Sequence, residues 1–193
     1  MSELYKNKFR ISSARLKTWD YGSSGMYFIT ICTRNKEYFF GDIVECDDLE
    51  TQCIASLQRM QLNELGKTAE TEWLKTCELR PDMNLELAEY IVMPNHFHGI
   101  ISIGDNQHNT IEADSNSASY QKNKFGPQSK NLAAVVRGFK SAVTTFARKS
   151  DTPFDWQTRF HDHIIRTHDE YFRIANYILN NPDNWQEDKF YIK

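Results

Sequence analysis

The sequence lacks the features that mark several common classes of protein. It has no apolar run long enough to cross a membrane, and its first residues include no signal-like apolar segment. None of its four cysteines stands in a Cys-x-x-Cys pair, which argues against a zinc site and a disulfide framework. There is no internal repeat, and 193 residues are enough for one core. We therefore expect a soluble cytoplasmic protein with reduced cysteines and a single domain over residues 1–193.

The net charge of −3 hides a strong segregation of charge along the chain. Residues 1–36 contain 7 Lys and Arg against 2 Asp and Glu, and residues 120–149 contain 7 against none, which gives charges of +5 and +7. Residues 37–119 contain 4 against 16, a charge of −12. Two basic blocks on an acidic body favour a polyanionic partner on one side of the molecule, and ordinary solvated faces are the alternative.

Apolar periodicity predicts four strands and three helices. The strands are expected at residues 26–33, 85–92, 96–103 and 160–166, and the helices at residues 53–77, 132–149 and 167–181. A short extra hairpin is expected in the acidic stretch that ends at residue 50. The order β-α-β-β-α-β plus one helix is that of a ferredoxin-like α+β domain with an antiparallel central sheet. In that topology the strands at residues 26–33 and 96–103 are central.

Two segments fall outside this pattern. Residues 1–25 are basic and aromatic without a clear period, so we expect either an arm that grips phosphates and stacks on bases or an ordinary strap. Residues 104–130 are polar and poor in apolar residues, which predicts a long mobile loop.

A His-x-His motif lies on the third expected strand. A turn is expected at Pro94 and Asn95, just before it. His96 and His98 are two residues apart, so the period of a strand puts both imidazoles on one face. Two neutral imidazoles on a rigid strand can share one divalent cation, and a hydrogen-bonded pair of histidines is the alternative.

The last expected helix contains a tyrosine and an asparagine that could join a metal site. Tyr177 and Asn181 are four residues apart and so share one helical face. Two imidazoles and one amide oxygen, with water completing the shell, suit Mg²⁺ or Mn²⁺. A tyrosine can act as a covalent nucleophile once a base or a nearby charge lowers the pKa of its phenol, and no residue in the sequence identifies that base.

Five segments of the chain resemble those of a known family. They are SARLKTWDY (residues 13–21), YFITICT (27–33), MPNHFHGI (93–100), VRGFKS (136–141) and YILNNPDNW (177–185). The resemblance is to the single-tyrosine transposases of the HUH endonuclease superfamily, in particular the REP-associated tyrosine transposases. It runs over nearly the whole chain in the family's order, and the last motif is specific.

The resemblance implies a ferredoxin-like HUH fold with a C-terminal catalytic helix, and Mg²⁺- or Mn²⁺-dependent cleavage and joining of single-stranded DNA. Carried onto matching positions, Tyr177 is the nucleophile that forms a 5′-phosphotyrosine, and His96, His98 and Asn181 hold the metal. The substrate would be single-stranded or hairpin DNA of REP-like repeats, bound by a monomer or a homodimer. The candidate phosphate contacts are Arg10, Arg15, Lys17, Arg137 and Lys140.

Several alternatives stay open. Tyr171 is a rival nucleophile, although it lies about 120° away from Tyr177 around the helix. His161 and His163 form a second His-x-His motif that could bind metal or phosphate. The whole chain could also be a hairpin-binding protein without turnover, or a metal-dependent hydrolase of small molecules. The hydrolase reading leaves Tyr177 and the basic blocks without a role.

Overall fold

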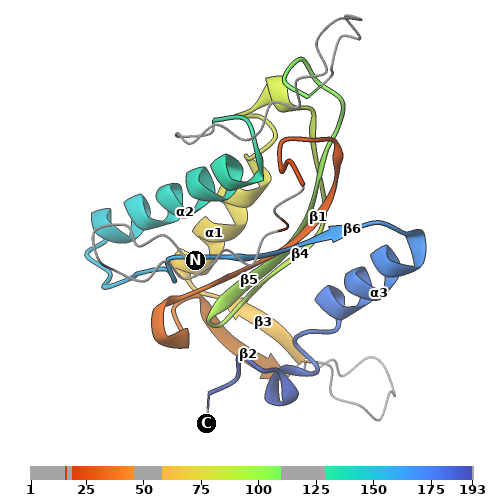
Figure 1. Ribbon diagram of the computed structural model, residues 1–193. Helices are drawn as coiled ribbons and strands as arrows, with labels where there is room; N and C mark the ends of the chain where they lie inside the picture. The colour runs from red at the N-terminus through yellow and green to blue at the C-terminus, as the bar shows by residue number, and fades with distance from the viewer. Residues whose placement is uncertain (1–15, 17–18, 46–57, 110–128, 193) are drawn as a thin grey trace, which may run out of the picture.

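The computed structural model describes residue 16 and residues 19–45, 58–109 and 129–192 (Figure 1). The strands are β1 (Gly25–Cys32), β2 (Gly41–Glu45), β3 (Gln58–Leu62), β4 (Leu85–Met93), β5 (His96–Ile103) and β6 (His161–Ile165). The helices are α1 (Glu64–Leu74), α2 (Leu132–Lys149) and α3 (His168–Leu179), with short 3₁₀ turns at Arg34–Lys36, Pro81–Met83 and Trp185–Glu187.

Four strands form one antiparallel sheet in the order β4-β5-β1-β6. β1 and β5 are therefore the central strands, and the histidine motif lies on a central strand, as the ferredoxin-like topology predicts. β2 and β3 pair as a separate antiparallel hairpin at one end of this sheet (Figure 1). The mixed α+β fold expected from the sequence is confirmed.

The two faces of the sheet are covered unequally. Alternation along β1 sends Tyr27, Ile29 and Ile31 to one face, where they join the larger core beneath α1 and α2 (Figure 1). The other face is covered by α3 over a small cluster. Its buried members are Ile100, Ile165, Ile174, Ala175 and Ile178. The face under α3 is also the face to which His96 and His98 point, because they alternate with Phe97 of the larger core.

The helix expected at residues 53–77 is wrong at both ends. α1 begins only at Glu64, after Asn63, whose side chain accepts a hydrogen bond from the Gly66 N–H as an N-cap. The segment Gln58–Leu62 is instead β3, the second strand of the hairpin with β2. The hairpin was expected, but its second strand lies later in the chain than expected. Residues 53–57 lie outside the described residues.

The other expected elements differ by a few residues at most. α2 has the expected bounds, and β6 is shorter than expected by one residue at each end. α3 starts after Thr167, whose hydroxyl accepts from the Glu170 N–H as an N-cap, and it ends at Leu179. Asn181 therefore lies in the turn beyond the helix.

Among the helices within the described ranges, none is long and apolar enough to cross a membrane. Most of the expected N-terminal arm (residues 1–15 and 17–18) and most of the expected loop (residues 110–128) lie outside the described residues. Cys32 and Cys77 carry free thiols.

Candidate active site

His96 and His98 lie side by side in the interior, on the face of the sheet that α3 covers. Their ring centroids are 4.4 Å apart, and their exposed fractions are 0% and 1%. β1 runs beside them, with Cys32 opposite His96 and Thr30 opposite His98. Both rings are held in place by the strand and by tight packing, which is what a rigid ligand pair requires.

Asn95 and Thr30 set the orientation of the two imidazoles. The Asn95 amide nitrogen donates to the main-chain carbonyls of Lys36 and Phe190, at 2.9 and 2.8 Å. Its amide oxygen is therefore the group that accepts from His96 Nδ1, at 2.9 Å. This bond places the His96 proton on Nδ1 and leaves a lone pair on Nε2. His98 Nδ1 lies 2.9 Å from the Thr30 hydroxyl, which supports that ring in the same way.

Both imidazoles are neutral at pH 7. Burial lowers the pKa of His96 to about 3, because a charged ring would lose its hydration. Burial also lowers the pKa of His98 well below its ordinary value, and the neighbouring His96 adds to this effect. A neutral imidazole is the form that binds a metal ion.

α3 and the turn after it bring a phenol and an amide to the histidines. The Tyr177 hydroxyl lies 3.2 Å from His98 Nε2 and 3.1 Å from Asp188 Oδ2. Asn181 Nδ2 donates to the same Asp188 oxygen, at 3.1 Å. Tyr177 is 39% exposed, whereas both imidazoles are buried. A substrate would therefore reach the site from the side on which the Tyr177 ring meets the solvent.

The Tyr177 phenol is kept in its neutral form. Burial of the hydroxyl raises the pKa of Tyr177 above its ordinary value, and the negative charge of Asp188 raises it further. Asn181 opposes this effect. The phenol would need positive charge near its oxygen before it could ionise at neutral pH.

The donor set fits a divalent cation. His96 Nε2 and Asn181 Oδ1 are buried and have no hydrogen-bond partner among the described residues. Only a protonated His96 could donate to Asn181 Oδ1, and in the neutral tautomer both atoms are acceptors. His96, His98 and Asp188 also offer ligand atoms that all lie within 4.8 Å of one another. Nitrogen and oxygen donors facing one another without a proton between them are what a cation such as Mg²⁺ or Mn²⁺ would satisfy.

Three residues at the site are missed by sequence reasoning. Asp188 and Phe190 follow α3 in a segment without regular structure, where no period or spacing marks them. The Phe190 N–H donates to Asp188 Oδ1 at 2.7 Å, and its ring centroid lies 4.5 Å from that of His96. Asn95 stands directly before the histidine motif, and that adjacency is the one signal that could have marked it as a support for His96.

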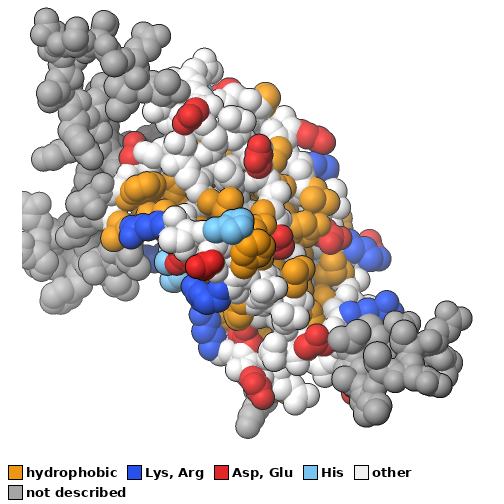
Figure 2. Space-filling view, turned by 90° about the vertical axis from the view of Figure 1, so that its right-hand side faces the viewer, with side chains coloured by type: hydrophobic (Ala, Val, Ile, Leu, Met, Phe, Trp, Pro, Cys, Tyr) orange, Lys and Arg blue, Asp and Glu red, His pale blue; other side chains and the backbone are white. Residues whose placement is uncertain are grey.

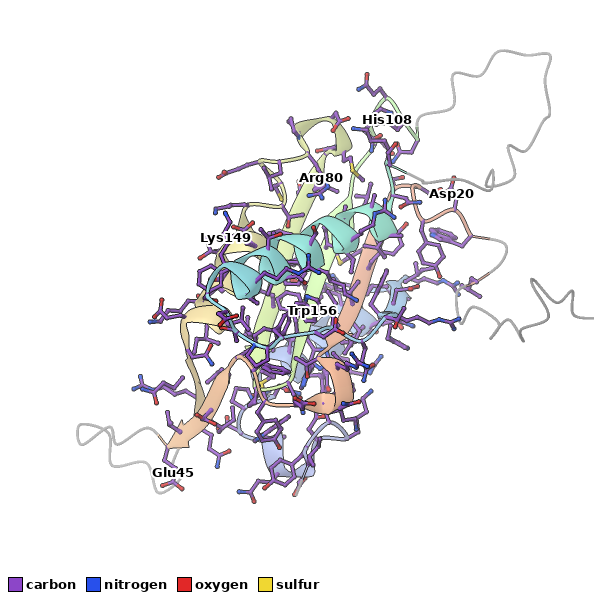
Figure 3. The ribbon with its side chains drawn as sticks, turned by 90° about the vertical axis from the view of Figure 1, so that its left-hand side faces the viewer. Asp20, Glu45, Arg80, His108, Lys149 and Trp156 are labelled. Carbon is purple, nitrogen blue, oxygen red and sulfur yellow. The ribbon has the colours of Figure 1, made fainter. Side chains whose placement is uncertain are left out.

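The expected phosphate contacts are not gathered at this site. Arg137 and Lys140 lie on α2, which covers the opposite face of the sheet (Figures 1 and 3). The Lys140 ammonium donates to the Gln157 carbonyl and lies 5.9 Å from the centre of the Trp156 ring, which Figure 3 shows beside α2. Arg10, Arg15 and Lys17 lie outside the described residues.

The rival residues have other partners. The Tyr171 hydroxyl donates to the Glu89 carboxylate on β4, with oxygens at 2.9 and 2.8 Å. Its pKa is raised, first by this hydrogen bond and then by burial. His163 Nε2 lies 2.7 Å from Glu170 Oε1, and neither His161 nor His163 belongs to a cluster of metal-ligand side chains within the described part of the chain.

The fold is shared with a solved structure. A REP-associated tyrosine transposase, solved bound to a REP hairpin, aligns with 93% of this chain and 77% of its own, at 18% identity and a TM-score of 0.53. The chain thus has the fold of this class of transposases, as the sequence resemblance implied.

A curated relative defines the family. An uncharacterized protein of Haemophilus influenzae is 38% identical over 181 residues, which cover 93% of this chain and 92% of that protein. The chain belongs to the family of this protein. No protein-family model matches the sequence.

Proposed function

We propose that the protein is a transposase-like endonuclease and strand transferase that acts on single-stranded, hairpin-forming DNA in the cytoplasm. Tyr177 is the nucleophile, and His96, His98 and Asn181 are the metal ligands, with Asp188 as an additional oxygen donor. The cation is Mg²⁺ or Mn²⁺. The fold of the hairpin-bound transposase and the sequence motifs around these residues support the proposal.

One observation carries the proposal. The Tyr177 hydroxyl lies 3.2 Å from an imidazole of a buried pair, beside two buried acceptors that have no hydrogen-bond partner in the described part of the chain. A tyrosine that served only packing would not need two neutral imidazoles and an unsatisfied amide oxygen around its hydroxyl. The arrangement fits a nucleophile directed at a phosphate, because a cation held by these acceptors would offset the negative charge that develops on the phosphate oxygens in the transition state.

The chemistry follows from the positions of these side chains. Tyr177 Oη attacks the scissile phosphorus in line, its bond to phosphorus forms, and the bond from phosphorus to the 3′-oxygen breaks. The phenol proton leaves toward Asp188 Oδ2, 3.1 Å away, and the 3′-oxygen leaves as a hydroxyl after taking a proton from water. A bound divalent cation would supply positive charge that polarises the phosphate and favours the ionised phenol. The 5′-phosphotyrosine keeps the bond energy, so a second 3′-hydroxyl can reverse the reaction and join strands.

The test is the substitution Tyr177→Phe, which removes one hydroxyl and keeps the ring. We expect the parent protein, with Mn²⁺ or Mg²⁺ and a hairpin oligonucleotide that carries single-stranded arms, to form a covalent adduct that resists denaturant. The Y177F protein should bind the same DNA and form none. The matched control is Tyr171→Phe on the same helix, which should form the adduct as the parent does. An adduct that persists in Y177F would refute the assignment.

A hairpin-binding protein without turnover is the second candidate. It is favoured by the neutral phenol of Tyr177 and by Phe190, which packs against His96 at the site. The same gel separates the two, because a binding protein would retain the DNA and yield no adduct with any metal.

A further inference from the structure

The floor of the site continues across the sheet beyond the histidines. On β1, Thr30 lies opposite His98 on one side and opposite His161 of β6 on the other. These three side chains therefore form one row across three neighbouring strands, on the face that α3 covers only in part. Adjacent strands are about 4.8 Å apart, so His161 lies about 10 Å from His98 along this row.

The next row adds an aromatic ring. Phe28 lies opposite Ile100 on β5 and opposite His163 on β6. Its ring centroid is 5.2 Å from His98 and 6.3 Å from Tyr177, with the Tyr177 ring edge-on. Phe28 is only partly buried, so a ring that contacts both site residues also reaches the surface. A partly exposed aromatic ring beside a phosphate site is a platform on which a base can stack.

β6 borders a cleft at the edge of the sheet. The cleft has a volume of about 390 Å³, and its lining includes Leu16, His161, His163 and Arg166. His161, His163 and Arg166 are exposed, and Leu16 is 48% exposed. This volume lies in the range of small-ligand sites and is sufficient for a nucleotide.

The cleft lining also includes Tyr21, Asp162 and Glu170, and Asp162 alternates with His161 and His163 along β6, so it points to the other face of the sheet. On the face of His161, the side chains of His163 and Glu170 hold the structure together. The Glu170 carboxylate accepts from His163 Nε2 at 2.7 Å and from the Arg166 main-chain N–H at 2.9 Å. That carboxylate is thereby anchored to β6 at the start of α3. His161 and the Arg166 guanidinium remain as donors, since an imidazole N–H donates to a phosphate oxygen whether or not the ring is charged. An Arg guanidinium matches two phosphate oxygens.

We propose that β6 carries the single strand away from the cleavage site, with His161 and Arg166 on its phosphates and Phe28 beneath a base. This inference rests on the proposed function and names the part of the substrate that the site requires: a single-stranded extension next to the hairpin. A strand advances about 3.4 Å per nucleotide when stacked, so the phosphate at His161 is at most about three nucleotides from the scissile one.

The experiment compares oligonucleotides with and without that extension. Fluorescence anisotropy without metal measures the affinity for a hairpin with six-nucleotide extensions at both ends and for the same hairpin with blunt ends. We expect His161→Ala and Arg166→Ala each to weaken binding of the extended hairpin about 5- to 10-fold and to leave binding of the blunt hairpin unchanged. Arg166→Ala should also make the salt dependence of log affinity shallower by about 0.7, the value for one phosphate contact on a single strand.

The matched control is Lys67→Ala, an exposed lysine of α1 that pairs with Glu64 in the acidic stretch 37–119, on the other face of the sheet. It should leave both affinities unchanged. Thermal melting checks that the variants fold, which is expected because His161 and Arg166 are exposed.

The outcomes separate this inference from the proposed function. If the parent protein forms the covalent adduct but H161A and R166A bind the extended hairpin as the parent does, the path across β6 is refuted and the proposed function stands. The path is also refuted if both variants lose the blunt and extended hairpins equally. A parent protein that binds neither oligonucleotide would refute both proposals.

Discussion

Asn95 does more for the site than its place in a turn suggests. Its amide nitrogen donates to two main-chain carbonyls, so its oxygen is the atom that faces His96 Nδ1, and accepting from that nitrogen fixes the tautomer of His96. The consequence is a lone pair on His96 Nε2 that faces the site and that no described residue hydrogen-bonds. One amide thus gives a buried histidine a lone pair with a defined direction, as a metal ligand would need.

The buried imidazoles make stability depend on pH. The folded protein holds the pKa of His96 at about 3, whereas an unfolded histidine has a pKa of about 6.5. Between these values the unfolded chain binds a proton that the folded chain does not, so the contribution is present above pH 6.5 and is lost as the pH falls toward 3. For each histidine whose pKa is lowered by folding, the free energy of unfolding falls by up to about 1.4 kcal/mol for every unit by which the pH falls within this range.

Urea denaturation of the metal-free protein measures this effect. From pH 6.0 to 5.0 the parent should lose about 1 kcal/mol more unfolding free energy than His96→Gln, in which no group titrates at that position. His161→Gln is the control, because His161 lies exposed on the edge strand β6, and its loss should leave the difference between pH 6.0 and 5.0 as in the parent. Parallel pH curves for the parent and H96Q would show that His96 is not held neutral by the fold.

Among the helices, α1 and α2 each contain a glycine. A side chain added there would meet main-chain atoms at one position and a flexible side chain at the other. A Cβ on Gly66 would lie 2.2 Å from the Phe40 carbonyl oxygen, which is a main-chain atom that cannot move aside. A Cβ on Gly138 would lie 2.0 Å from the end of the Arg80 side chain, which can swing away. Figure 3 shows Arg80 beside α2. Gly66 therefore lets α1 pack against the main chain just before β2. Gly138 only leaves room for the Arg80 side chain.

Alanine substitutions at the two positions should therefore differ in how much they destabilise the protein. Gly66→Ala is expected to destabilise the protein by about 2 to 3 kcal/mol through overpacking. Gly138→Ala should change stability by less than about 1 kcal/mol, because the higher helix propensity of Ala offsets the displacement of Arg80. Thermal or urea unfolding of the two variants side by side checks this. If G138A proved as damaging as G66A, the Arg80 contact would have to be essential to the fold.

The elements also show what periodicity can predict. α2 has the expected bounds because its apolar stripe, its Asn131 cap and its basic last turn all agree. The sequence predicts a helix over residues 58–62 because Leu62 fits the apolar period of α1, and only the pairing with β2 makes this segment a strand. His96, His98, Tyr177 and Asn181 could be named from motif and spacing. Asp188 could not, because it reaches the site from an irregular segment whose position depends on tertiary contacts.

The molecule as a whole is built unevenly about its sheet. Within the described residues, the core beneath α1 and α2 contains 22 buried residues, and the cluster beneath α3 contains 5. Figure 2 looks onto the side of the molecule where α3 lies, and hydrophobic side chains remain exposed there. Phe172 and Leu179 of α3 are 49% and 61% exposed. The helix that carries the proposed nucleophile is therefore the one with the least apolar support.

Polar contacts compensate for part of this at the two edges of the sheet. Tyr171 of α3 bonds Glu89 on β4, and Glu170 bonds His163 on β6. These bonds join α3 to both edge strands, yet both lie near the surface, where a hydrogen bond contributes little net stability. α3 should therefore open more readily than the helices on the other face, in the manner of a locally unfolding unit.

Native-state hydrogen exchange tests this order of stability. We expect amides of α3 (residues 168–179) to exchange faster than the central amides of α2 (residues 132–149) and of β1 and β5, because fewer buried apolar groups must separate to expose them. Tyr171→Phe should speed exchange in α3 further and leave α2 unchanged, since it removes only the bond to Glu89.

Added Mn²⁺ should slow exchange in α3 of the parent, because a ligand that binds through Asn181 stabilises the closed form. The same addition should have no effect in His98→Gln. Equal protection of α2 and α3 in the metal-free parent would mean that the small cluster and the two edge contacts hold α3 as firmly as the main core holds α2.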